Sequence, residues 1–203
     1  MIVQCAKLSL MKQVILIHGL PDEKEVREDV CPSPSNSHWF PWIQKQLTRK
    51  DLVCQTPEMP RSYNPNYNDH ERVMNQIDIS NETTLVGHSC GGGFLLRYLS
   101  DHKNIVPKKV IIVAPWLDLE KHLQELNPKS EYFDFTVDQK LTERTNLVCI
   151  YSTDDNKCIL DTVEYIKKEL PNADFLAFSD KGHFTEPDLG SKEFPELLAE
   201  ILK

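Results

Sequence analysis

Short apolar runs alternate with amphipathic stretches along most of this chain. Each run has the length of one buried strand and is bounded by turn residues, which predicts six strands, at 13–17, 52–55, 83–86, 109–113, 147–151 and 174–178. Segments of helical period lie between most of them. Strands that alternate with helices build parallel βαβ units. The pattern therefore predicts an α/β fold: a three-layer sandwich in which helices cover both faces of a mostly parallel central sheet of about six strands.

Helices are expected where apolar residues recur every three or four positions. Ser37 is the predicted cap of a helix that contains Trp39, and Asp69 is the predicted cap of the next helix. Later helices are expected around 94–99 and at 159–170 and 194–203. The remaining polar or proline-containing segments are predicted to be loops, at 21–37, 57–68 and 115–145. The last of these could form a small helical flap but is too short for a large lid domain.

Composition narrows the class of protein. A length of 203 residues fits one compact domain, so we expect a single domain over residues 1–203. The net charge of -8 and the lack of clustered lysine and arginine argue against nucleic-acid binding. No run of about 18 apolar residues is present, which argues against a membrane span.

The N-terminus and the cysteines bear on location. The first residues lack the basic start and the cleavage site of a secretory signal, and Met11 is an alternative start site that would make residues 1–10 a dispensable extension. The six cysteines lack the paired spacing of a zinc site or of a disulfide framework. We therefore expect no metal, no cofactor and a reducing location, the cytoplasm, with the nucleus as the alternative.

The segment Gly87-His88-Ser89-Cys90-Gly91 fits the pattern G-x-S-x-G. This pattern, called a nucleophile elbow, places a serine on a tight turn between a strand and a helix, where its hydroxyl stands clear of the backbone. A predicted strand precedes the segment and a predicted helix follows it, and the two glycines leave room for the sharp bend. Ser89 is therefore the predicted nucleophile.

The same glycines could instead form a nucleotide-binding turn. A phosphate-binding loop would need a lysine after the glycines, and none follows. A dinucleotide site would need its glycines after the first strand, where the chain has His18-Gly19-Leu20-Pro21 with a single glycine. Both nucleotide sites fit less well than the elbow, while a glycine-rich turn without chemistry is the plain alternative.

Candidates for the acid and the base follow the later strands in the order that this motif requires. The pair Asp154-Asp155 comes directly after the strand at 147–151, and His183 follows the strand at 174–178. The carboxyl ends of parallel strands lie at one edge of the sheet, so these segments can converge on Ser89. His183 is then the predicted general base, and one of the two aspartates orients its ring. Adjacent side chains point in different directions, so only one of the pair can reach the histidine.

An acyl-transfer site also needs donors for the oxyanion of its intermediate. The expected donors are the backbone N–H groups of Cys90 and Leu20. Several aromatic side chains adjoin the predicted site. His18 and His88 are expected to line a pocket. Trp39 and Trp116 are expected first of all to pack in the core, with the lining of an acyl pocket as the alternative.

With these motifs the chain resembles the small α/β-hydrolases of the retinoblastoma-binding protein 9 type and their bacterial relatives. The resemblance runs from about residue 13 to the end and is carried by Gly87-His88-Ser89, Arg97-Tyr98, Ser152-Thr153-Asp154-Asp155, His38-Trp39-Phe40-Pro41-Trp42 and Gly182-His183-Phe184. It implies an α/β-hydrolase fold and serine-hydrolase activity. It also implies that Asp155 is the acid that orients His183, because the second aspartate of the pair has this role in the family.

The chain departs from that family in three places. The turn after the first strand has fewer glycines and leads into a charged loop, 22–29, and no proline follows Asp155. The Leu-x-Cys-x-Glu motif for binding a retinoblastoma-type pocket is missing, since the nearest match is Leu52-Val53-Cys54-Gln55-Thr56. That protein partner is therefore not expected, and other protein partners are not indicated.

The sequence as a whole predicts a serine hydrolase that cleaves a small ester, thioester or amide through an acyl-enzyme intermediate. Its expected partner is a small-molecule acyl substrate. Two alternatives use the same residues or the same scaffold: an acyltransferase with the same triad, and a non-catalytic protein-binding module.

Overall fold

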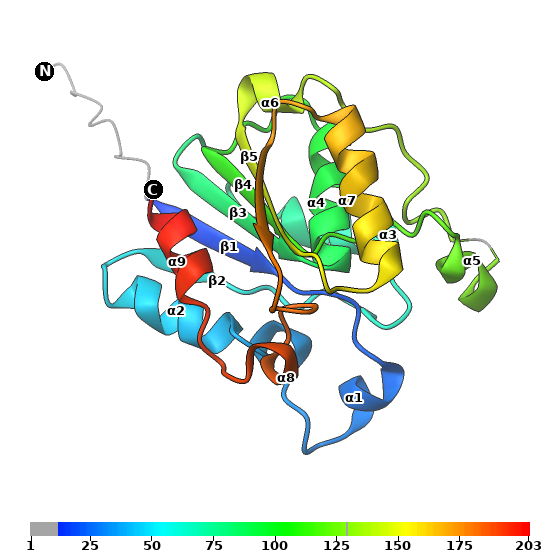
Figure 1. The fold of residues 1–203 in the computed structure, drawn as a ribbon, viewed down its shortest axis with the longest axis horizontal. Helices are drawn as coiled ribbons and strands as arrows, with labels where there is room; N and C mark the ends of the chain where they lie inside the picture. The colour runs from blue at the N-terminus through cyan, green and yellow to red at the C-terminus, as the bar shows by residue number, and fades with distance from the viewer. Residues whose placement is uncertain (1–11, 129) are drawn as a thin grey trace, which may run out of the picture.

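The computed structural model describes residues 12–128 and 130–203, so the proposed extension at 1–10 lies outside the described residues. Figure 1 shows a central sheet with helices on both of its faces. The sheet has six strands in the order β2-β1-β3-β4-β5-β6, and all five pairings are parallel. The strands are β1 (Gln13–Ile17), β2 (Val53–Gln55), β3 (Thr83–His88), β4 (Lys109–Val113), β5 (Asn146–Ser152) and β6 (Asp174–Phe178). The predicted α/β fold is confirmed.

The strand order reverses beside β1. The chain places β2 on one side of β1 and then crosses back to place β3 on the other side. In a parallel sheet the carboxyl ends of the strands on either side of such a reversal border a crevice, because the connections leave in opposite directions. Ile17 at the end of β1 pairs with Gly87 near the end of β3, so this crevice lies directly at the G-x-S-x-G segment.

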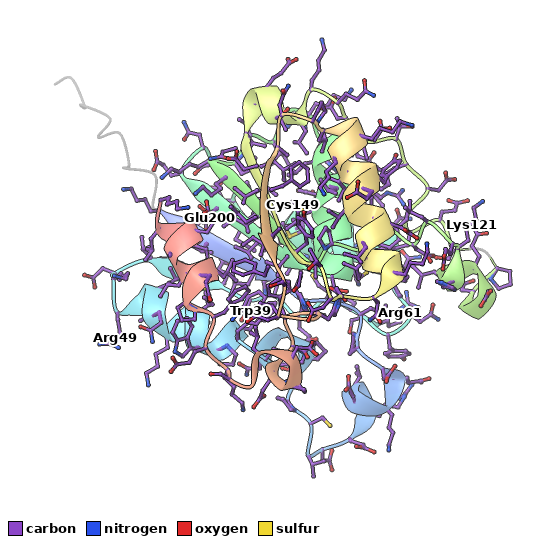
Figure 2. All side chains as sticks on the ribbon, in the orientation of Figure 1. Trp39, Arg49, Arg61, Lys121, Cys149 and Glu200 are labelled. Carbon is purple, nitrogen blue, oxygen red and sulfur yellow. The ribbon has the colours of Figure 1, made fainter. Side chains whose placement is uncertain are left out.

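Two helical layers cover the sheet, because alternate strand residues face opposite sides. On one face, Ile15 and its equivalents pack against α3 (Tyr67–Met74), α4 (Cys90–Asp101) and α7 (Lys157–Glu169). On the other face, Leu16 and its equivalents pack against α2 (Phe40–Thr48) and α9 (Pro195–Leu202). Figure 2 shows Trp39 and Cys149 inside these layers, with Arg49 and Lys121 at the periphery. Each fully buried large apolar side chain contributes roughly 1.5–3 kcal/mol.

Both predicted helix caps are wrong, for different local reasons. The N-cap of α2 is Trp39, and the Ser37 hydroxyl donates to the carbonyl of Ser33 at 3.1 Å inside the preceding turn. The N-cap of α3 is Asn66, whose side-chain oxygen accepts the N–H of Asp69 at 3.3 Å. The helix therefore begins before Asp69, and the Asp69 carboxylate pairs with Arg61 instead.

Several segments predicted to be loops contain short helices. The loop at 21–37 holds α1 (Glu23–Arg27) and a 3₁₀ turn (Pro34–Asn36), and α8 (Glu186–Leu189) follows β6. Segment 115–145, as far as it is described, contains only α5 (His122–Leu126) and α6 (Leu141–Arg144), and forms no large lid. Among the described residues no helix has the length and hydropathy needed to cross a bilayer.

Candidate active site

Ser89 lies on a strained turn between β3 and α4. Its φ and ψ are 53° and -122°, a left-handed conformation that is unfavourable for a residue with a side chain. The turn is held from both sides, because the Ser89 N–H donates to the carbonyl of Val113 at 2.9 Å and the Ser89 carbonyl accepts the N–H of Trp116 at 3.1 Å. Strain that the surroundings enforce in this way is typical of functional turns.

The two glycines of the motif make this turn possible. A Cβ atom on Gly91 would lie 2.5 Å from the carbonyl oxygen of Ile17, and one on Gly87 would lie 2.5 Å from the carbonyl oxygen of Gly91. Both neighbours are backbone atoms and cannot rotate away. Only glycine therefore fits at these two positions, as the sequence predicts. The close backbone contact that it allows holds helix α4 against the end of β1.

His183 and Asp155 are hydrogen-bonded to each other. The Nδ1–H of His183 donates to Oδ2 of Asp155 at 2.9 Å, and Oδ1 lies 3.2 Å away. The Asp155 side chain is 1% exposed and the His183 side chain 24%, so the carboxylate is enclosed while the ring reaches solvent. Asp155 also accepts the N–H of Asn156 at 2.6 Å, which fixes its orientation.

Asp154 supports the same loop from another side. It accepts a hydrogen bond from the Ser152 hydroxyl and one from the N–H of Gly182 at 3.2 Å. The Ser152 hydrogen bond is the main reason why the pKa of Asp154 is lower than usual. Asp155, and not Asp154, therefore faces the histidine ring, while Asp154 holds the turn in which Gly182 has a φ of +48°.

Two hydrogen bonds fix the segment after β6 that carries His183. The His183 N–H donates to Oδ2 of Asp188 at 3.1 Å. The indole N–H of Trp39 donates to the carbonyl of Phe184 at 3.1 Å, and the Trp39 side chain is fully buried. Trp39 thus lies in the core, as first expected for it, and it positions the loop.

His88 connects the serine turn to the histidine loop. Its Nε2–H donates to the backbone carbonyl of His183 at 2.8 Å, and the centroids of the two rings are 5.0 Å apart. Burial, and next the charge on His183, keep the pKa of His88 well below its ordinary value. His88 is therefore neutral near neutral pH and does not place a second positive charge beside His183.

His18 joins the end of β1 to the loop before α3. Its Nε2 accepts the N–H of Met59 at 3.0 Å, and its Nδ1–H donates to the carbonyl of Gly19 at 2.9 Å. The Glu58 carboxylate lies 3.3 Å from the same Nε2, so it can pair with the ring only when His18 is protonated. Both ring nitrogens are thus occupied by structural contacts, in keeping with a role in shaping the site.

A cavity of about 280 Å³ lies where these elements meet. Its lining brings together most of the residues that the sequence predicts for the site: Ser89, His183, His18, His88 and Leu20. Trp116 is not part of this lining and packs against Phe133 with the ring centroids 5.7 Å apart. Asp155 lies behind His183, where a carboxylate can orient the ring without contacting the contents of the cavity.

Cys90 and Leu20, the predicted oxyanion donors, both lie near Ser89. Cys90 is the first residue of α4, where N–H groups have no partner within the helix, and Leu20 lines the cavity. The thiol of Cys90 is buried, and burial raises its pKa to about 12. It is therefore a poor nucleophile, and the serine beside it is the better-placed one.

The sequence did not indicate the role of His38 in the cavity wall. Its φ is 54°, its ring lies 6.2 Å from that of His88, and it lines the same cavity as Ser89. Its position before an aromatic run was the only local signal. Among the described residues no group of three or more histidine, cysteine or acidic side chains could hold a metal ion.

Comparison with known proteins places this geometry among hydrolases. The family model described as "Serine hydrolase" matches residues 32–202. The protein YdeN of Bacillus subtilis (strain 168) is 24% identical over 184 residues, which covers 88% of this chain and 89% of YdeN. The crystal structure of the ydeN gene product superimposes with a TM-score of 0.75 over 95% of this chain and 97% of that one. A monoacylglycerol lipase from Paleococcus ferrophilus has the same fold, with a TM-score of 0.62, 14% identity and coverage of 94% and 93%.

Proposed function

Because the chain belongs to the serine hydrolase family, we propose that it cleaves a small ester, thioester or amide through an acyl-enzyme formed on Ser89. One observation carries the proposal: His183 is bonded through Nδ1 to the buried Asp155 and lines the same cavity as Ser89. An imidazole that donates from Nδ1 has an unprotonated Nε2 in its neutral form. Such a ring can take a proton from a hydroxyl beside it.

The proposed reaction has two matched halves. His183 Nε2 takes the Ser89 hydroxyl proton while Oγ forms a bond to the acyl carbon of the substrate, and the acyl oxygen becomes an oxyanion. The oxyanion then re-forms its double bond, the bond to the leaving group breaks, and His183 gives its proton to the leaving atom. In the second half a water molecule attacks the acyl carbon in place of the serine hydroxyl, and His183 Nε2 takes the water proton. The bond from the acyl carbon to Oγ then breaks, His183 gives the proton to Oγ, and the acid product leaves with Ser89 restored.

Asp155 and the backbone donors stabilise the charges that form. The carboxylate holds the ring in one tautomer and stabilises the imidazolium, and loss of such a group typically lowers turnover on the order of 10⁴-fold. The N–H groups of Cys90 and Leu20 are the proposed oxyanion donors, and each such donor typically stabilises the transition state by about 2.7–4 kcal/mol. Within the family we infer that the chain is of the retinoblastoma-binding protein 9 type, on the basis of its Asp154-Asp155 and Gly182-His183-Phe184 motifs.

Labelling with a fluorophosphonate probe tests the proposal. We expect the probe to modify Ser89, as identified by peptide mass spectrometry, and labelling to disappear in Ser89→Ala and His183→Ala. Ser179→Ala, which changes an exposed serine, is the matched control and should be labelled like the unchanged protein. Folded protein that hydrolyses no ester in a panel of short acyl esters, and that the probe does not modify, would contradict the proposal and favour the binding module. Transfer of the acyl group to an added alcohol, instead of release of the free acid, would indicate that the protein is an acyltransferase.

A further inference from the structure

His38 is held in one orientation at the wall of the cavity. It lies in the left-handed region, with a φ of 54°, and its Nδ1 accepts the backbone N–H of Glu186 at 3.1 Å. Glu186 is the first residue of α8, three positions after His183. The bond therefore joins the segment before α2 to the loop that carries His183, and it leaves little freedom to the ring.

This contact determines where the His38 proton lies. A backbone N–H can only donate, so Nδ1 must be unprotonated. Burial lowers the pKa of His38 below its ordinary value, which keeps the ring neutral near neutral pH. The single ring proton is then on Nε2. The structure gives this Nε2–H no hydrogen-bond partner among the described residues, and the ring is only half-buried, so the N–H is free to bind a ligand.

A second, outer cavity of about 560 Å³ adjoins the cavity that holds Ser89. The two share six lining residues: Pro21, Glu25, Pro34, Ser37, His38 and Pro187. Cys31, Pro32, Glu186 and Gly190 complete the outer wall. His38 thus lies at the boundary between the two cavities.

The position of the outer cavity decides which part of a substrate can enter it. In the proposed reaction His183 returns its proton to the leaving atom, so the leaving group must lie on the side of the histidine loop. The outer cavity is bounded on that side by the residues that follow His183, from Glu186 to Gly190. The alcohol or amine part of a substrate therefore extends into the outer cavity, while the acyl carbon stays at Ser89.

The outer cavity also carries negative charge. Glu25 and Glu186 both line it, and none of its described lining residues is a lysine or an arginine. Lys192 lies 3.7 Å from Glu186 but is well exposed, so this pair offsets little of the charge. A leaving group that ends in a carboxylate would be repelled here.

We propose that His38 is a specificity-determining residue for the leaving group: its Nε2–H donates to an acceptor atom of an uncharged alcohol part that occupies the outer cavity. This inference rests on the proposed function, because it needs the acyl carbon at Ser89. It names the substrate class as esters whose alcohol part carries an ether, carbonyl or hydroxyl oxygen and no negative charge.

Acetate esters that differ only in the alcohol part test this inference. Hexyl acetate is the reference, and the acetates of propoxyethanol and ethoxypropanol each have one ether oxygen in place of a methylene. The measured quantity is the ratio of kcat/KM for the better ether ester to that for hexyl acetate. In His38→Asn the side-chain oxygen can still accept the Glu186 N–H, but the shorter amide has no N–H at the position of Nε2, so this ratio should fall roughly 2- to 10-fold, as for one neutral hydrogen bond. In His38→Gln a donor remains near the position of Nε2, so the ratio should fall less.

The outcomes separate this inference from the function on which it rests. His122→Asn, a matched change at an exposed histidine of α5, should leave the ratio as it is. The acetate of hydroxypentanoate should react more slowly than hexyl acetate, and added salt should narrow the gap. Equal ratios in the unchanged protein, His38→Asn and His38→Gln would overturn the role of His38, even where hydrolysis still requires Ser89. No hydrolysis of any ester and no probe label on Ser89 would overturn the function and this inference together.

Discussion

The Nδ1 atom of His183 lies 2.9 Å from Oδ2 of Asp155, whereas the adjacent Asp154 accepts from the N–H of Gly182. One aspartate thus orients the ring, and the other shapes the turn that presents it. The sequence places both directly after β5, and only the direction of the two side chains separates their roles. The two roles can be tested separately by removing the charge of Asp154 or that of Asp155.

Asp155→Asn should lower kcat for ester hydrolysis on the order of 10⁴-fold, because an amide favours the wrong tautomer of His183. Asp154→Asn retains an oxygen that can accept from Gly182, so we expect a loss of less than about 10-fold. Steady-state kinetics on one short ester measures both, with circular dichroism to show that each variant is folded. A larger loss in Asp154→Asn than in Asp155→Asn would reverse the assignment.

His88 should stabilise the loop of the base through a single donor. His88→Leu leaves the half-buried carbonyl of His183 without its partner, which should lower the free energy of unfolding by about 1 kcal/mol and reduce kcat. His88→Gln can place an amide N–H near the position of Nε2 and should restore part of both. Urea denaturation and ester turnover provide the two measurements. If the glutamine variant is no better than the leucine variant, the hydrogen bond of 2.8 Å is not what matters.

Acid should destabilise the fold through His70. This buried ring accepts from the Tyr132 hydroxyl at 2.7 Å and donates to the carbonyl of Pro60 at 2.9 Å, and burial lowers its pKa to about 4. The unfolded chain, with a histidine pKa of about 6.5, binds more protons between these values. The stability that the neutral ring contributes is therefore present above about pH 6.5 and is lost as the pH falls toward 4, on the order of 3 kcal/mol in total.

The measurement for His70 is the slope of the free energy of unfolding between about pH 4 and 6.5. His70→Gln should make this slope shallower, because the group that takes up the proton is gone. His122→Gln, which removes an exposed histidine, should leave the slope as in the unchanged protein. Equal slopes in all three proteins would show that His70 does not titrate in this range.

The serine turn should not tolerate a methyl group at Gly91. Gly91→Ala places a Cβ atom 2.5 Å from the carbonyl oxygen of Ile17, so the helix or the strand must shift. We expect a loss of several kcal/mol, at the upper end for single substitutions. Gly190→Ala has open space around its Cβ but a φ of +63°, so it should cost about 1 kcal/mol. Thermal unfolding of the two variants, compared side by side, gives the answer.

The fold could be predicted well because the six apolar runs are long enough to mark buried strands. All six strands lie within one or two residues of their predicted bounds. The caps could not be predicted in the same way. Asn66, three residues before Asp69, caps α3, and the Ser37 hydroxyl donates to the carbonyl of Ser33 instead of accepting from α2. Short helices such as α1 and α8 were missed because a single helical turn has little periodicity.

The centre of the site was predictable because three strands of a parallel sheet end at one edge. Ser89 and His183 line one cavity, and Asp155 is bonded to the ring. His38 was not predictable as a cavity residue, because its place depends on a left-handed backbone and on a bond to Glu186, which is far away in the sequence. The sequence favoured the core for Trp39, and the structure places it there, with its indole N–H bonded to the carbonyl of Phe184 in the loop that carries His183.

The left-handed backbone at Ser89 has a consequence for how this protein can change over time. Glycine adopts that conformation without penalty, so replacing Ser89 by glycine would relieve strain of about 1–3 kcal/mol and yield a more durable but inert protein. Laboratory selection for heat resistance alone would therefore enrich glycine at this position. If a screen for activity is added to that selection, we expect serine to be retained. The comparison would show how much stability the protein gives up at this residue for its catalytic activity.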